Sequence, residues 1–477
     1  MKRSTIVGGS LFGMVALISL ISLISLIIHN NVRPEVRHEV REESRDGVAP
    51  APLVATPKAS SPGEHPVESS GILFGRITTV DGGRYEGRLR WAGDDEAYWS
   101  HTFNGKKAEN RWAAEVPAGR LPRVSTPIRI FGVQIAHREH LLDMDRLFFV
   151  HFGDIARIDA LGIRVRLTLK SGMKVDLDRL EASDFDDGIR VWDGTRGVVD
   201  LDSSRIRVIE FLPTPALGDA EVPVRLYGSV RARAGKFTGF VQWNRQNGAG
   251  SDELVGRSDD GEVRPRFDSI RSIVRRSPAT SLVTFRDGRE TVLSGTRAVG
   301  EGNRGVYVDD DRYGRVSVSW DAFESIDFGA VAPSDTGPAY ADFPPGRALS
   351  GSVTTRDGRH LAGRLVYDLD ESETTETLDA PAHGVDFSIP FGRIVSIALP
   401  DPDDHSDLHA MVTLDSGEAL QLELGGDLGP KNGGLLIFAD GASSPEYLAW
   451  SEIRRIDFDR SPDSGGMRGA PSPSMSK

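Results

Sequence analysis

The densest group of side chains able to bind a metal ion lies between residues 137 and 145. His137 and His140 are three residues apart, and Asp143 and Asp145 follow closely. Imidazole nitrogens and carboxylate oxygens are ordinary zinc ligands, and residues three apart share one face of a helix. This segment carries the hypothesis of a metal-dependent hydrolase, beside the simpler interpretation of a polar surface segment.

Two short motifs match signatures of known sites, but their surroundings favour turns. Residues 300–305 fit the GxGxxG pattern, which binds a dinucleotide when it precedes a helix. Here the motif precedes Val306 and Val308, whose alternation is typical of a strand. Ser171 and Lys174 match the Ser-x-x-Lys pair of some acyl-transfer enzymes. That pair occupies a position that is a hairpin turn in other copies of the same pattern, so we expect a turn there too.

Three clusters of aspartates are candidates for weak cation binding, at residues 184–187, 309–311 and 401–404. A calcium-binding EF-hand loop closes with a glutamate at its twelfth position, and counting from Asp309 that residue is Trp320. We therefore interpret all three clusters as solvated loops.

An aromatic residue recurs at one position of a repeated pattern, as Trp91, Trp243 and Tyr367. Repeated aromatics can stack on sugars, which is the basis of a second alternative, a carbohydrate-binding protein. An aromatic at the same place in every repeat is more commonly a core anchor, because each ring buries about 150–250 Å². We place these three in the core, and we assign no catalytic, cofactor-binding or metal-ligating residue in the chain.

These candidates lie in a chain made of repeats, and a repeat defines the building block of the fold. Glycine-bounded hairpins begin at Gly75, Gly228 and Gly351. In each repeat a first half ends with an aromatic residue followed by two spaced isoleucines. A second half ends with Ile-Glu-Phe or Ile-Asp-Phe, at residues 209–211, 326–328 and 456–458. We therefore predict three repeats of two halves, at residues 71–212, 223–329 and 347–459, with proline-rich breaks between them.

The first repeat contains an insertion at about residues 105–150. The interval from Gly239 to Ile270 has the same length as the interval from Gly363 to Ile394. The corresponding interval in the first repeat, from Gly87 to Ile155, is much longer. The insertion includes the two histidines of the metal hypothesis.

Alternating apolar residues and Asp-Gly pairs, at residues 81–82, 287–288 and 357–358, predict short antiparallel strands joined by tight turns. The hairpin at residues 353–365 and the closing pair at 389–397 resemble those of Sm-like or SH3-like small β-barrels. The resemblance implies an all-β fold of tandem small barrels, up to six of them over residues 71–459, and it implies no function. The alternative architecture is a six-bladed β-propeller with one half per blade.

The bulk composition excludes several classes of function. The 477 residues carry a net charge of −13, which argues against nucleic-acid binding because that activity needs clustered cations. Cysteine is absent, so disulfides, thiolate metal sites and cysteine nucleophiles are excluded.

Residues 5–28 form an uncharged apolar segment behind a short tail at residues 1–4. As a helix this segment is long enough to cross a hydrocarbon core of about 30 Å. No small-residue cleavage site follows it, so we expect an uncleaved transmembrane signal anchor. Residues 29–70 are expected to be a stalk and a Pro/Ala/Ser-rich linker, and residues 460–477 a disordered tail.

Together these features predict a single-pass cell-membrane protein that displays tandem β modules. Arginines beyond the span oppose an outward body under the positive-inside rule. We nevertheless expect the body on the extracytoplasmic, periplasmic side, because short N-terminal anchors usually export the domain that follows. Its expected role is non-catalytic binding or scaffolding in a cell envelope. The expected partners are other envelope proteins or copies of itself, bound through sheet edges and the insertion.

Overall fold

A computed structural model describes residues 71–460, except residues 92–94, 100, 118, 122, 131–132, 142–146, 216–223, 330–336 and 402–407. These residues belong to one of two compact units, His65–Lys477; the other is Met1–Glu64. The expected anchor at residues 5–28 and its stalk lie outside the described residues. Within the described residues, no helix is sufficiently long and apolar to cross a membrane.

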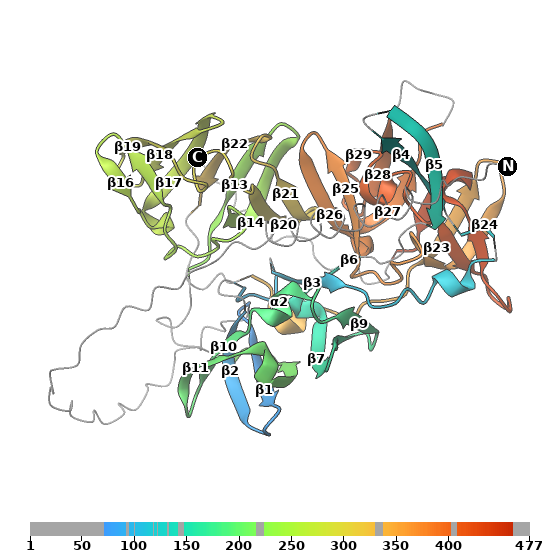
Figure 1. Ribbon diagram of the computed structural model, residues 1–477, viewed down its shortest axis with the longest axis horizontal. Helices are drawn as coiled ribbons and strands as arrows, with labels where there is room; N and C mark the ends of the chain where they lie inside the picture. The colour runs from blue at the N-terminus through green and yellow to red at the C-terminus, as the bar shows by residue number, and fades with distance from the viewer. Residues whose placement is uncertain are drawn as a thin grey trace, which may run out of the picture. The chain divides into compact units, whose positions relative to one another are not determined.

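The described residues confirm the all-β prediction (Figure 1). Every strand ladder in them is antiparallel, and the three large sheets contain eight, twelve and eight strands. The α-helical segment that they include, α2 (Ser183–Asp186), is a single turn.

The second repeat shows most clearly how two halves combine. Each half contributes two hairpins, a short 3-10 turn or bend, and a last strand. The first half supplies β13 (Tyr227–Ala232), β14 (Gly235–Trp243), β15 (Gly256–Ser258), β16 (Gly261–Val263) and β17 (Ile270–Ser277). The second half supplies β18 (Thr280–Phe285), β19 (Glu290–Ser294), β20 (Val306–Asp310), β21 (Gly314–Val318) and β22 (Phe323–Phe328).

The two halves interlock in one sheet. Strand β22, the last of the second half, lies between β13 and β17 of the first half. The second hairpin of each half pairs with the first hairpin of the other, β15 with β19 and β20 with β14. The order β16-β15-β19-β18-β17-β22-β13-β14-β20-β21 is unchanged when the halves are exchanged and the order is reversed. The sheet therefore has a pseudo-twofold axis between β17 and β22.

The expectation of separately closed small barrels is wrong for the described residues, because each half completes its sheet with strands of the other. The outermost strands of each large sheet do not pair with one another, so these sheets stay open. The six-bladed propeller fails for the same reason, since a half-repeat does not form a blade of its own.

In the first and third repeats, eight of the ten strands follow this order. The other two, the second hairpin of the first half, form a separate two-stranded sheet in the first repeat, and in the third repeat they join the sheet of the second repeat. In the first repeat the corresponding strands are β1 (Phe74–Thr79), β2 (Arg84–Trp91), β3 (Thr102–Lys106), β6 (Leu147–His151), β7 (Ile155–Leu161), β8 (Arg164–Leu169), β9 (Lys174–Asp178), β10 (Ile189–Asp193), β11 (Gly197–Leu201) and β12 (Ile206–Phe211). In the third they are β23 (Ser350–Thr355), β24 (His360–Val366), β25 (Thr377–Ala382), β26 (Val385–Pro390), β27 (Ile394–Ala398), β28 (His409–Leu414), β29 (Ala419–Glu423), β30 (Leu435–Phe438), β31 (Glu446–Leu448) and β32 (Ile453–Phe458). The insertion adds a separate ribbon, β4 (Arg123–Ile130) and β5 (Val133–Leu141).

The second and third repeats are joined by strand pairing. Strand β26 of the third repeat adds to β21 of the second, through residue pairs from Arg315–Ser388 to Val318–Val385. As a result β20, β21, β26 and β25 lie side by side in the twelve-stranded sheet (Figure 1).

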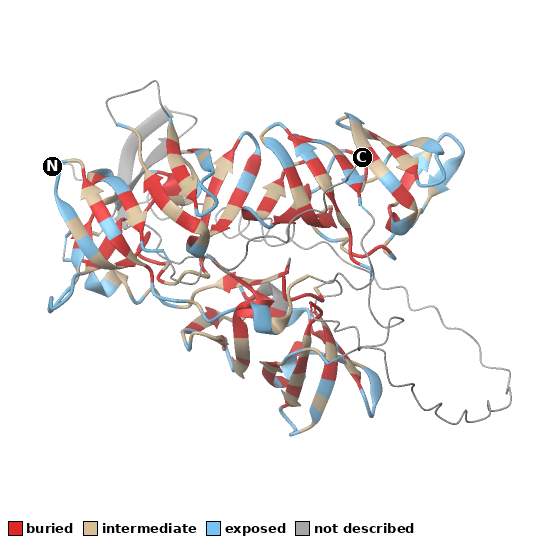
Figure 2. Cartoon of the chain, turned by 180° about the vertical axis from the view of Figure 1, so that it is seen from behind, coloured by how far each residue is buried: buried red, intermediate tan, exposed pale blue. Residues whose placement is uncertain are grey.

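The core follows the strand alternation, with buried and solvent-facing residues alternating along the sheets (Figure 2). Trp91, Trp243 and Tyr367 are each fully buried, as expected for core anchors. The Trp243 indole also donates a hydrogen bond to the carbonyl of Ala298, at 2.8 Å. These rings are therefore out of reach of a sugar, and the carbohydrate hypothesis loses the residues that motivated it.

Candidate functional site

The segment with the two histidines is a strand. His137 and His140 lie on β5, which pairs with β4. The expectation that one helical face carries both histidines is therefore wrong. Asp143 and Asp145 lie outside the described residues, and no group of three or more potential ligands within the described residues is placed to hold a metal ion.

The two enzyme-like motifs are turns, as the sequence indicates. Gly302 and Gly305 have φ angles of 85° and 99°, and the chain then enters strand β20. Ser171 lies in the turn between β8 and β9, where its hydroxyl accepts a hydrogen bond from the Met173 amide at 3.1 Å. Neither motif opens a helix.

The aspartates at residues 309–311 correct the solvated-loop interpretation. Asp309 and Asp310 lie on β20 and are only 1% and 2% exposed. Arg315 donates to Asp309 at 3.1 Å, and Arg312 donates to Asp310 at 2.8 Å. Burial raises the pKa of Asp309, an effect that the neighbouring Arg315 opposes. These carboxylates are structural ion pairs, because a buried charge needs a partner. Of the other clusters, residues 184–187 fall in and after α2, and 402–404 lie outside the described residues.

The first part of the insertion binds the third repeat, so the insertion is not a free surface along its whole length. Lys107 donates to Asp370 at 2.7 Å and to Glu376 at 3.1 Å. Burial disfavours the charge of Lys107, but the two carboxylates outweigh this effect and raise its pKa. The lysine thus forms a largely buried ion triad between the first and third repeats.

A second set of contacts extends this attachment. We call the attached segment, residues 107–117 and 119–121, the clamp. Asn110 donates to the carbonyl of Leu369 at 3.0 Å, and Val116 packs in a small apolar cluster with Leu369 and Leu436. Arg120 donates to the backbone carbonyl of Tyr447, on β31, at 3.2 Å. The clamp therefore covers β31, the last strand at one edge of the third repeat.

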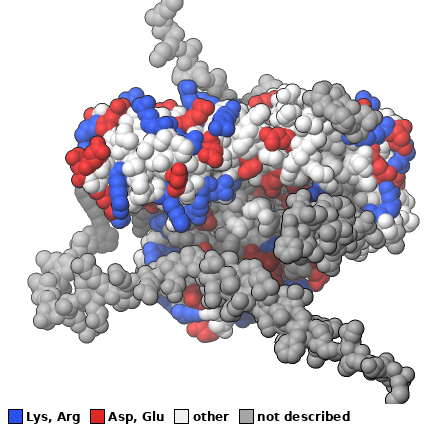
Figure 3. Space-filling view, turned by 45° about the horizontal axis from the view of Figure 1, so that its top comes forward, with Lys and Arg blue, Asp and Glu red and all other residues white. Residues whose placement is uncertain are grey.

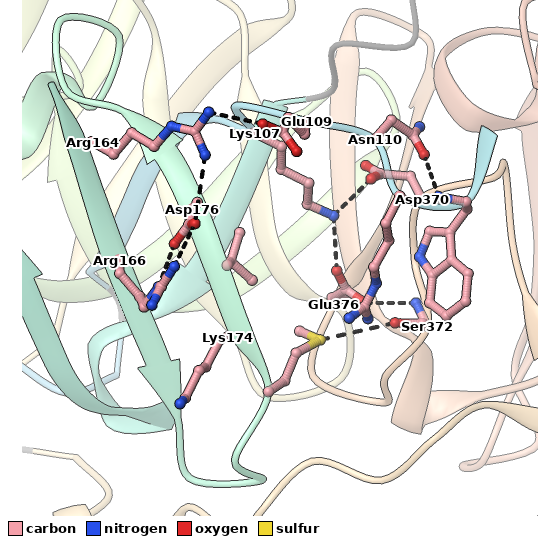
Figure 4. A pocket seen from close by; sticks show the side chains of 14 residues that line it. Lys107, Glu109, Asn110, Arg164, Arg166, Lys174, Asp176, Asp370, Ser372 and Glu376 are labelled. Carbon is pink, nitrogen blue, oxygen red and sulfur yellow. Dashed lines mark hydrogen bonds and ion pairs between the residues drawn. The ribbon is translucent and has the colours of Figure 1, made fainter. Parts of the chain in front are cut away.

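A cavity of about 320 Å³ lies between the clamp and strands β8 and β9 (Figure 4). Its charged side chains mostly bind each other: Lys107 binds the carboxylates of the third repeat, and Arg166 binds Asp176 at 2.6 Å (Figure 4). Arg164 likewise binds Glu109 at 2.8 Å. Groups that are already paired are poorly suited to acid–base chemistry, so we interpret this cavity as a polar seam between two repeats.

A second cavity, of about 210 Å³, lies where all three repeats meet. Its floor is the junction of the second and third repeats, on strands β20, β21, β26 and β25, and residues of β3 and β6 in the first repeat also line it. His151 of β6 is buried and stacks on Trp99 with ring centroids 4.5 Å apart. Burial lowers the pKa of His151 to about 3, so it is neutral near pH 7. Sequence reasoning missed this cavity because its residues come from three repeats and form no local motif.

Comparison of the chain with family models, with curated proteins and with solved structures finds no match. The functional argument therefore rests on the chain's own geometry.

Proposed function

We propose that this protein is a non-catalytic binding or scaffold protein of a cell envelope, tethered to the membrane by residues 5–28, with its body on the extracytoplasmic side. The uncharged length of that segment supports the tether. Lys and Arg are interspersed with Asp and Glu on the face drawn in Figure 3. A mixed surface of this kind favours protein partners over nucleic acid.

One observation carries the binding role: the equivalent edge strands of the three repeats, β21, β31 and β11, are covered in different ways. In the second repeat, β21 pairs with β26. In the third repeat, β31 is covered by the clamp, through Arg120 and Tyr447. In the first repeat, β11 pairs with β10 and with no other strand of the described residues.

Strand β11 has the properties of a receptor edge. It is five residues long, like β21, and begins with a positive-φ glycine in the same way. Val198 on β11 is 58% exposed. The edge strand at the opposite end of the second repeat, β16, is only three residues long, and short edge strands resist pairing. We infer that a partner adds an extended strand to β11, as β26 adds to β21.

The succession of elements in each half also supports a finer proposal about the fold. Both halves run as two hairpins and a last strand, which is the succession expected of an SH3-like or Sm-like unit. We propose that each repeat is a pair of such units that have exchanged their last strands, with the second hairpin of the second half paired to the first half; in the second repeat the exchange of second hairpins is mutual. This architecture leaves one edge strand per half available for lateral contacts.

A crosslinking experiment tests the binding role. The chain has no cysteine, so one introduced cysteine is its sole thiol. A thiol-reactive photo-crosslinker is attached to a Val198→Cys variant of the full chain in its native membrane. The matched control is Val80→Cys, since Val80 is 62% exposed and lies beside a hairpin turn. We expect a discrete envelope protein to crosslink from position 198 and not from position 80. Identical patterns from both positions, or none from either, would contradict the proposal.

A further inference from the structure

The cavity at the meeting point of the three repeats has a floor built from two parallel rows of side chains. In one row, Asp309, Arg315, Ser388 and Asp379 are successive cross-strand neighbours on β20, β21, β26 and β25. In the next row, Tyr307, Ser317 and Asp386 are neighbours on the first three of these strands. Residues two apart on a strand share a face, so both rows belong to the same face of the sheet.

Part of the polar lining of this cavity lacks hydrogen-bond partners. Four side-chain atoms of its lining are buried and bind no other atom of the described residues: His151 Nδ1, Arg245 Nε, Thr375 Oγ1 and Asp379 Oδ1. Buried polar atoms of folded proteins almost always have a partner, either protein or something bound. The four orphaned atoms therefore leave hydrogen-bonding capacity on the cavity wall for a bound molecule.

Two arginines and two aspartates line the cavity, and of the arginines Arg315 is already paired with Asp309. Arg245 donates to the Ser317 hydroxyl at 2.8 Å and has no acidic partner within 4.0 Å among the described residues. Its backbone has a φ of 55°, the left-handed conformation, as does the preceding Asn244. Asp368 and Leu369 have the same conformation at the matching turn of the third repeat, so this turn belongs to the repeated fold and sets the direction in which Arg245 leaves the chain.

Two carboxylates lie across the strand junction from Arg245. Asp386 is the direct cross-strand neighbour of Ser317, and Asp379 lies on the adjoining strand β25. Burial raises the pKa of Asp379 to about 6, although hydrogen bonds from Ser388 and Thr377 oppose the rise, and the negative charge of Asp386 adds to it. A cation placed between the two carboxylates would relieve their repulsion.

We propose that this cavity binds a small zwitterion of amino-acid size, with its carboxylate against Arg245 and its ammonium group between Asp379 and Asp386. Ser317, which accepts from Arg245, is the antiparallel neighbour of Asp386, and the Cα atoms of such neighbours lie about 4.5–5.5 Å apart. One ligand with an anionic and a cationic group on the same or adjacent carbons therefore spans both ends. A water molecule takes about 30 Å³ of liquid volume, so the cavity is much larger than a single bridging water requires.

The lining argues against a simple anion or a simple cation. An anion alone would leave Asp379 and Asp386 close together without a counter-charge. A cation alone would leave the orphaned Arg245 nitrogen without an acceptor. The hydroxyls of Thr102, Thr375, Ser317 and Ser388 add donors and acceptors that suit the polar edges of the ligand.

Calorimetric titration of the purified full chain tests the proposal. The probes are a panel of L- and D-amino acids with β-alanine and γ-aminobutyrate. Acetate and methylammonium, at equal ionic strength, carry each charge alone. We expect saturable binding of at least one zwitterion, and at least about tenfold weaker binding of acetate and of methylammonium, because each loses one charged hydrogen-bonding group. Binding of acetate or methylammonium as tight as that of every zwitterion would overturn the proposal, as would the absence of saturable binding to any zwitterion.

Two conservative variants locate the site, each with a matched control. Arg245→Met and Asp386→Asn should each weaken zwitterion binding about tenfold or more. Arg271→Met and Asp260→Asn change exposed residues outside the cavity and should bind as the parent does. Thermal unfolding of all four checks that they fold. Unchanged binding in a folded Arg245→Met protein would show that the ligand lies elsewhere and would overturn the assignment.

Discussion

Strands β21 and β31 are equivalent edges that the protein closes by different means. At β21 the closure is a backbone ladder with β26. At β31 it is a set of side chains from the clamp, with Arg120 on a backbone carbonyl and Lys107 in a buried triad nearby. A ladder needs only a strand in register, whereas the clamp needs particular side chains at particular places. The first closure should therefore tolerate many substitutions and the second very few.

The largest effect is expected from breaking the clamp at Lys107. In Lys107→Met, Asp370 and Glu376 keep their buried positions without a cation, and removing one member of a buried ion pair costs about 3–5 kcal/mol. We expect a loss of that order in the free energy of unfolding by urea. Lys174→Met is the control, since Lys174 lines the same cavity, is exposed, and has no ion pair among the described residues.

A triple variant sharpens this test. Adding Asp370→Asn and Glu376→Gln to Lys107→Met removes the uncompensated charges and should restore most of the stability. If Lys107→Met is as stable as Lys174→Met, the clamp does not hold the first repeat to the third.

An intermediate effect is expected at the strand junction, where two equivalent glycines provide a matched pair. Gly314 begins β21 and Gly197 begins β11, with φ angles of 83° and 74°. Alanine at either position carries the left-handed penalty of about 1–2 kcal/mol. At Gly314 its Cβ would also lie 2.7 Å from the Ser388 carbonyl oxygen and from Pro390, whereas at Gly197 nothing lies within 4 Å.

The difference between the two alanine variants therefore isolates the contact with β26. We expect Gly314→Ala to lower the unfolding free energy by about 1–3 kcal/mol more than Gly197→Ala, the usual cost of overpacking. Urea denaturation measures both. Equal losses would mean that β26 does not pack against β21.

The sequence predicts much of the local structure and little of the long-range pairing. The Asp-Gly turns, the repeated Ile-Asp-Phe closings and the buried aromatics follow from alternation and turn chemistry. Ile326 and Phe328, for example, lie on β22 at the centre of their sheet. The exchange between halves is not visible in the sequence, because the two halves carry the same pattern and each last strand has two equivalent partners to choose from.

The candidate sites were harder to predict because their residues are far apart in the chain. Lys107 and Asp370 are separated by 263 positions, and neither has an unusual sequence neighbourhood. The strongest sequence candidates, His137 and His140, depend on a helical spacing that the strand β5 does not have. The sequence also predicts exposure for Asp309 and Asp310, because a run of acidic residues is usually exposed, yet both are buried. The alternating valines beside them were the available sign of a strand.

The smallest effect on stability is expected at the open edge, β11, where the protein has neither a ladder nor a clamp. Asp200 on β11 is paired with Arg190 at 2.7 Å, and both side chains are about half exposed or more. Such surface pairs are worth about 1 kcal/mol or less, so Asp200→Asn should unfold almost as the parent does. A charge on an edge strand also discourages unwanted pairing, and its loss should increase self-association, measured by sedimentation velocity. Glu86→Gln is the control: Glu86 has a comparable surface pair with Arg76, at 2.8 Å, but lies on β2 inside the sheet. Equal self-association of the two variants would mean that β11 is not the receptive edge, and the three equivalent strands would then differ only in how they are covered.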